Sequence, residues 1–110
     1  MLVKAIVIGP NGRYEQVFLV DTGASMSMIS AGLAQVTGPE NEGKTETFQT
    51  AKGPIDCRVV TRTIRVGEIE VTQEVAVNPV EDVALLGVSF FEGKSYLVDS
   101  SQKQLYVWNK

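Results

Sequence analysis

The segment of this chain best suited to chemistry is Asp21-Thr22-Gly23-Ala24-Ser25, which directly follows the apolar run 17–20. A short apolar run bounded by turn residues is typical of a buried β-strand, so the acid is expected where a strand enters a tight turn. Glycine and small residues let backbone amides lie close to the carboxylate. The segment therefore predicts one carboxylate held at a fixed point. The alternative is an ordinary turn residue that only accepts local N–H bonds.

The composition excludes most other catalytic chemistries. The chain has no His, which removes Ser-His and Cys-His triads, imidazole bases and most zinc sites. Cys57 is the only cysteine, so it can form neither an intramolecular disulfide nor a cysteine-rich metal site. We therefore expect no metal and no cofactor.

Charge and hydropathy limit the possible partners. The net charge is −3 and the ten Lys and Arg residues are scattered, so we expect no nucleic-acid partner. Residues 1–20 do not resemble a secretory signal, and no apolar stretch reaches the length of a membrane span. These features and the lone thiol predict a cytoplasmic protein. The length of 110 residues fits one domain over 1–110.

The elements that must position the acid are short strands rich in β-branched residues. Ser30 is expected to cap a brief helix that Gly38-Pro39 ends, and Lys52-Gly53-Pro54 is expected at the tip of a hairpin. A polar surface connection is expected over 38–44. The run 85–91 is expected to pass from a strand end into one helical turn. Strands are predicted over 2–8, 14–20, 26–29, 45–51, 55–66, 69–77, 96–98 and 104–108. This pattern indicates an all-β, small closed β-barrel with one or two short helices.

A single carboxylate is a poor hydrolytic catalyst, so a catalytic Asp21 requires a second acid beside it. Asp99 follows an apolar run but lacks the glycine, so it is expected to be a hairpin-turn residue, and Asp82 in a charged loop is expected to be solvated. Two carboxylates about 3 Å apart repel by roughly 5 kcal/mol, or about four pKa units, so one stays protonated beside its ionised partner. Such a pair is a good hydrolytic catalyst. Because the chain offers one such Asp, we expect a homodimer with a shared site.

The segment 20–25 and the later Ala84-Leu85-Leu86-Gly87 resemble the two hallmark motifs of retropepsin-like aspartic proteases, the single-domain group that includes the retroviral proteases. The hairpin over 47–60 stands where that family carries its flap, and the resemblance extends over nearly the whole chain. It implies an aspartic endopeptidase that acts on a polypeptide substrate as a homodimer.

The resemblance also implies roles for individual residues. Asp21 is the catalytic acid, Thr22 bonds across the dimer, Gly23 lines the peptide backbone, and Ala24 and Ser25 complete the active-site loop. The remaining implied residues are the flap or substrate-binding residues Ala51, Lys52, Gly53, Pro54 and Ile55, and the supporting loop Leu85, Leu86 and Gly87. The alternatives are that Thr22 serves only its own turn, that the two leucines are plain core, and that the hairpin tip is inert.

Three departures from the retroviral pattern stand out. The flap-like segment has one glycine followed by Pro54, Ser25-Met26 stands where many retroviral enzymes carry acidic residues, and a full hairpin over 96–108 replaces one short terminal strand. One alternative function and one alternative context remain open. The chain could be a retropepsin-fold module for dimerisation or peptide binding with little turnover. It could also be part of a longer protein and dimeric only there.

Overall fold

The structure is a computed structural model, and it describes residues 1–39, 43–99, 101–102 and 104–109. Two short helices interrupt a series of strands along the described chain. The elements are β1 (Leu2–Gly9), β2 (Gly12–Val20), β3 (Ser27–Ser30), α1 (Ala31–Thr37), β4 (Lys44–Thr50), β5 (Gly53–Val66), β6 (Ile69–Asn78), β7 (Ala84–Leu86), α2 (Val88–Phe91), β8 (Lys94–Asp99) and β9 (Gln104–Asn109).

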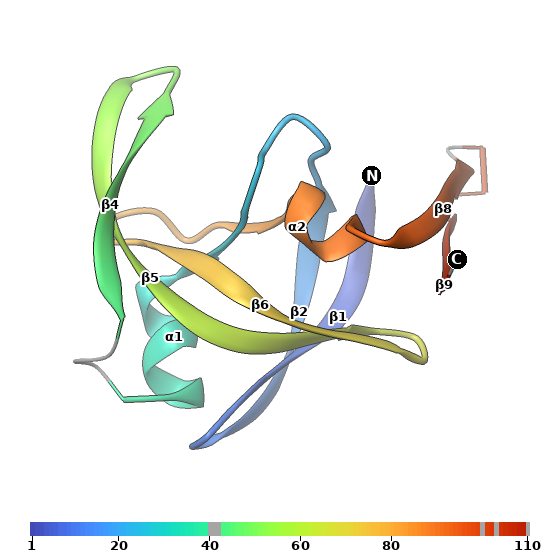
Figure 1. Ribbon diagram of the computed structural model, residues 1–110, viewed down its shortest axis with the longest axis horizontal. Helices are drawn as coiled ribbons and strands as arrows, with labels where there is room; N and C mark the ends of the chain where they lie inside the picture. The colour runs from blue at the N-terminus through green and yellow to red at the C-terminus, as the bar shows by residue number, and fades with distance from the viewer. Residues whose placement is uncertain (40–42, 100, 103, 110) are drawn as a thin grey trace.

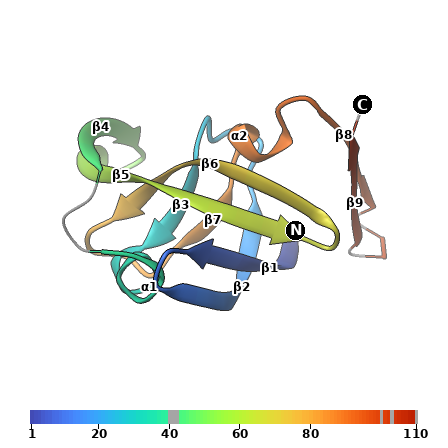
Figure 2. The same cartoon turned by 60° about the horizontal axis from the view of Figure 1, so that its bottom comes forward.

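Six of these strands close into a barrel, in the order β1-β2-β7-β3-β6-β5 (Figure 1). The second half of β5 closes it by pairing with β1, with Val7 opposite Ile64. Residues 53–57 of β5 extend beyond the barrel and pair with β4 alone, whereas Arg58 and Val59 pair with both β4 and β6. The predicted all-β closed barrel with one or two short helices is therefore confirmed, and the described chain has two. The β4–β5 hairpin and the β8–β9 hairpin lie on opposite sides of it (Figure 2).

The core inside the barrel is formed by side chains from alternate positions along several strands, such as Ala5 and Val7 of β1. This alternation arises because successive residues of a strand point to opposite faces of the sheet. Phe18, Ile29, Ile64 and Val75 are fully buried there. Phe90 from α2 closes the same cluster at one end of the barrel.

The helix α1 is fixed at both ends. The Ser30 hydroxyl accepts a hydrogen bond from the Leu33 N–H at 3.1 Å, which confirms the predicted cap. At the other end lies the guanidinium of Arg62, a residue only 2% exposed. It donates to Thr37 Oγ1 at 2.9 Å and to the Ala34 carbonyl at 3.0 Å. A cation at a helix C-terminus also interacts favourably with the helix dipole.

The chain ends in the predicted hairpin, a separate two-stranded sheet formed by β8 and β9. Opposite residues of an antiparallel pair share a face. One face carries Leu105 and Val107, which pack against the barrel core. The other face carries Leu97, Tyr106 and Trp108, which are 56%, 46% and 48% exposed. This second face is defined here as the outer face of the hairpin.

Some sequence predictions need correction or fall outside the described residues. The predicted hairpin tip is wrong in position: Ala51 and Lys52 make the turn, because Gly53 already pairs with Thr50 and Pro54 with Gln49. The predicted connection over 38–44 includes 40–42, and the predicted last turn includes Ser100 and Lys103, all outside the described residues. Neither α1 nor α2 has the length and apolar character needed to cross a membrane, and no other helix occurs in the described ranges.

Candidate active site

The acid turn is defined here as residues 21–25, and it begins where β2 ends. The strand pairs in parallel with β7, and the Asp21 N–H extends this ladder by donating to the Leu86 carbonyl at 3.0 Å. The Ala24 N–H donates back to the Asp21 carbonyl at 3.1 Å. The Gly23 N–H donates to Asp21 Oδ1 at 3.0 Å. The first two bonds fix the backbone of Asp21 and the third holds its carboxylate; the residue is half-buried, and Thr22 lies exposed beside it.

The segment after β7 supports the acid turn from behind. The first N–H groups of α2 point at the turn: Val88 donates to the Ala24 carbonyl at 2.8 Å and Ser89 to the Ser25 carbonyl at 3.2 Å. A side chain at Gly87 would collide with the same loop, since its Cβ would lie 2.8 Å from the Ala24 carbonyl oxygen. The fully buried Leu86 belongs to the core. The Leu-Leu-Gly segment thus brings the acid turn and α2 into direct backbone contact.

A buried polar cluster, which the sequence analysis missed, fixes the same region. The Gly87 N–H donates to Ser27 Oγ at 3.0 Å, and the Ser27 N–H donates to Ser89 Oγ at 3.2 Å. The Ser89 hydroxyl donates in turn to Gln73 Oε1 at 2.8 Å. Ser27 is fully buried at the start of β3, next to the apolar pair Met28 and Ile29, and a serine at that place is the sequence signal that could have indicated this cluster.

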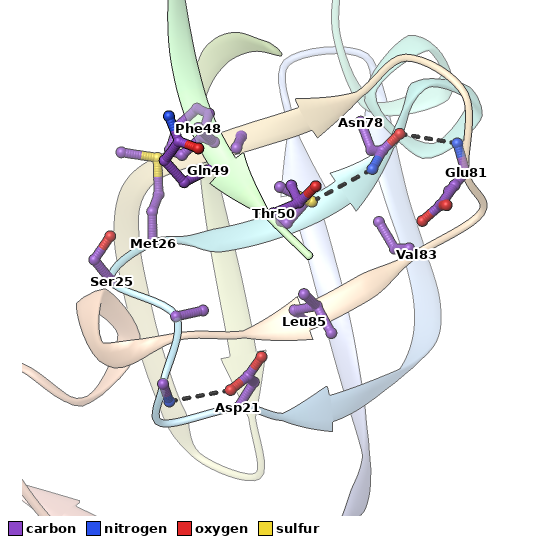
Figure 3. Close-up of a pocket in the computed structure, with 14 residues that line it drawn as sticks. Asp21, Ser25, Met26, Phe48, Gln49, Thr50, Asn78, Glu81, Val83 and Leu85 are labelled. Atoms are coloured by element: carbon purple, nitrogen blue, oxygen red, sulfur yellow. Dashed lines mark hydrogen bonds between the residues drawn. The ribbon is translucent and has the colours of Figure 1, made fainter. Parts of the chain in front are cut away.

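The acid turn forms the floor of a cavity of about 560 Å³ (Figure 3). Five residues predicted for the site line it: Asp21, Gly23, Ala24, Ser25 and Leu85. The lining residues that the sequence analysis missed are Met26, Met28, Phe48, Gln49, Thr50, Ala76, Asn78, Glu81 and Val83. The signal for part of this set was Phe48, the one apolar residue of β4.

The predicted flap residues lie over a neighbouring cavity. Ala51, Lys52, Gly53, Pro54 and Ile55 line a space of about 380 Å³ that also borders on Glu81. The turn is held by the Thr50 hydroxyl, which donates to the Gly53 carbonyl at 2.7 Å. Gly53 has a φ of +106°, a region that favours glycine. The part of this hairpin that faces Asp21 is therefore the end of β4, and the five predicted residues lie beside the main cavity.

The other acids behave as predicted from the sequence. Asp99 accepts hydrogen bonds from the Ser101 hydroxyl at 2.7 Å and the Gln102 N–H at 3.2 Å, which confirms it as a turn residue. These bonds lower the pKa of the Asp99 carboxyl below its usual value, the Ser101 bond most. Asp82 is exposed. Among the described residues, no three His, Cys, Asp or Glu side chains are grouped as metal ligands would be.

A closed barrel with an Asp-Thr-Gly turn facing a hairpin-covered cavity defines the class of single-domain acid proteases. Among solved structures, the chain is similar to the EIAV protease in complex with the inhibitor HBY-793, with a TM-score of 0.66 at 16% sequence identity. The likeness covers 84% of this chain and 85% of that chain, and it shows that the fold is that of a retroviral protease.

The family model for the "gag-polyprotein putative aspartyl protease" matches residues 8–93, which is more than half of the chain. The chain therefore belongs to this family, and the resemblance to retropepsin-like aspartic proteases is confirmed. None of the curated proteins matches the chain.

Proposed function

We propose that the protein is an aspartic endopeptidase that cleaves extended polypeptides as a homodimer, with Asp21 as the catalytic residue. The observation that carries this proposal is the position of Asp21 at the floor of a cavity with β4 along its opposite side. Two backbone bonds hold the residue there, and the Gly23 N–H bonds its carboxylate. A carboxylate that only closed its own turn would need neither the cavity nor the support from α2.

In the mechanism, two Asp21 carboxylates meet across a twofold axis and share one proton. Roughly 5 kcal/mol of repulsion at about 3 Å keeps one of them protonated. The ionised carboxylate takes a proton from a water molecule, whose oxygen attacks the peptide carbonyl while the protonated Asp21 donates to the carbonyl oxygen. Collapse of the tetrahedral intermediate passes a proton to the leaving amine and breaks the C–N bond.

Several surfaces near the acid turn favour dimerisation. Thr22 and Gly23 are exposed, so the turn is accessible to a second copy. Leu19, two residues before the turn, and Val88, whose N–H bonds Ala24 of the turn, are apolar residues that are each 41% exposed. The outer face of the β8–β9 hairpin adds Leu97, Tyr106 and Trp108, and exposed apolar surface of this extent is typical of an interface. We assign this outer face to the dimer.

Substrate binding follows from the shape of the cavity. Met26, Met28, Phe48, Val83 and Leu85 give it an apolar lining, and the end of β4 runs along it. An extended peptide between β4 and the acid turn buries apolar side chains in this lining and bonds through its backbone.

The decisive experiment compares the wild-type protein with Asp21→Asn, a nearly isosteric change at a half-buried position. The wild type is expected to cleave an unstructured protein near pH 5, and a statine-like transition-state mimic is expected to inhibit it. The variant keeps its circular dichroism spectrum and loses cleavage, which product masses measure. Cleavage by Asp21→Asn at the wild-type rate would falsify the mechanism. Peptide binding by the wild type without cleavage would favour the module without turnover.

A further inference from the structure

The main cavity, the one of about 560 Å³ above the acid turn, carries only negative charge. Of the 14 residues that line it, only Asp21 and Glu81 can ionise, and both are acids. Figure 3 shows that Glu81 lies across the cavity from Ser25 and Met26, and Asp21 lies on its floor. A peptide that runs through the cavity therefore meets one further negative charge, at the Glu81 side.

The backbone around Glu81 is fixed. The buried Asn78 side chain accepts hydrogen bonds from the Val80 N–H at 3.0 Å and from the Glu81 N–H at 2.9 Å. The Asn78 amide also lies 3.7 Å from the Met28 sulfur, inside the cavity lining. An asparagine that bonds the amides two and three residues ahead is a stable turn. The backbone from which the Glu81 side chain reaches the cavity is thus held in a defined position.

The Glu81 carboxylate already forms an ion pair with a lysine of this chain. Lys52 Nζ, at the turn of the β4–β5 hairpin, lies 3.0 Å from Glu81 Oε1. The two side chains are 85% and 50% exposed, so the pair is weak and easily exchanged. The contact shows which chemistry Glu81 accepts at this place: a primary ammonium group on a flexible stem, approaching from the hairpin side.

We propose that Glu81 is a specificity-determining residue that binds a Lys or Arg side chain of the substrate, and that Lys52 holds the same position until the substrate replaces it. The proposal rests on the proposed function, because it takes the main cavity as the peptide site. In a dimer the twofold axis repeats Glu81, so a basic residue is preferred at equivalent positions on both sides of the cleaved bond.

The test measures peptide binding to the Asp21→Asn protein by fluorescence anisotropy, so it does not depend on turnover. The probes are labelled apolar peptides with one Lys or one Gln, scanned through successive positions. At low salt the Lys peptide is expected to bind about fivefold more tightly at the best position, the range of an exposed ion pair, and 1 M salt removes the preference.

Two variants and a matched control complete the test. Glu81→Gln is expected to abolish the preference, that is, the ratio of the affinities for the Lys and the Gln peptide. Lys52→Gln is expected to increase this ratio about twofold, because the competing ammonium is gone. Asp82→Asn, the exposed neighbour that lines neither cavity, changes it by less than twofold. An unchanged preference in Glu81→Gln, equal binding of both peptides at all positions, or no binding of either peptide overturns the proposal. If the wild-type protein cleaves nothing but the Lys preference still depends on Glu81, the Glu81 proposal is supported and only the endopeptidase function is rejected.

Discussion

Gly87→Ala tests whether close backbone packing behind the acid turn sets both stability and activity. The new Cβ would lie 2.7 Å from the Met26 carbonyl carbon and oxygen and 2.8 Å from the Ala24 oxygen, whereas ordinary contact begins near 3.4 Å. All three atoms belong to the backbone, so no flexible side chain can move aside. Overpacking costs about 1–3 kcal/mol, and we expect a value near 3 kcal/mol here.

This loss is expected to lower the melting temperature by about 15 °C, because 1 kcal/mol corresponds to roughly 4–8 °C in a domain of this size. The acid turn must shift to admit the methyl group, and a misplacement of about 1 Å costs about 100-fold in rate. Urea unfolding followed by circular dichroism gives the stability, and peptide cleavage by the folded variant gives the activity, both at one fixed protein concentration.

Gly32→Ala is the matched control. Gly32 lies in α1 and its added Cβ would meet nothing within 4 Å. Alanine favours helix over glycine, so this variant is expected to gain about 0.5 kcal/mol and keep full activity. If Gly87→Ala unfolds at the wild-type urea concentration and cleaves at the wild-type rate, the packing argument for the acid turn is refuted.

Three further predictions concern the dimer, the core and the thiol. Leu97→Asp on the outer face of the hairpin weakens the proposed dimer at least tenfold in sedimentation, whereas Val36→Asp on α1, across the barrel, leaves it unchanged; equal sedimentation of the two variants argues against this interface. Arg62→Ala removes a buried guanidinium from the end of α1 and costs about 2–4 kcal/mol in urea unfolding, and a loss under about 1 kcal/mol contradicts the assigned bonds. Burial, with a smaller effect of the Asp56 charge, raises the pKa of the Cys57 thiol. The folded protein is therefore alkylated by iodoacetamide at pH 8 many times more slowly than in urea, and equal rates refute its protection.

The sequence by itself determined the local elements and the position of Asp21 in a turn at the end of a strand. The alternating strands, the Ser30 cap and the Asp-Thr-Gly turn follow from side-chain periodicity and turn chemistry, which act over a few residues. The same local logic misplaced the hairpin tip, since it put Gly53-Pro54 in the turn when both residues pair with β4. Glycine and proline mark a change of direction, but strand register decides which residues make the turn.

Only the tertiary structure decided what surrounds the acid. Gly87 and Ser27 are 60 residues apart in sequence and share a hydrogen bond, and Arg62 reaches the end of α1 from β5. Glu81 joins the cavity because Asn78 turns the chain after β6 and the β4–β5 hairpin lies beside it. Such contacts depend on barrel closure, in which the second half of β5 pairs with β6 and β1 while its first half pairs with β4. No local pattern encodes that choice, because it is set by packing among strands distant in the sequence.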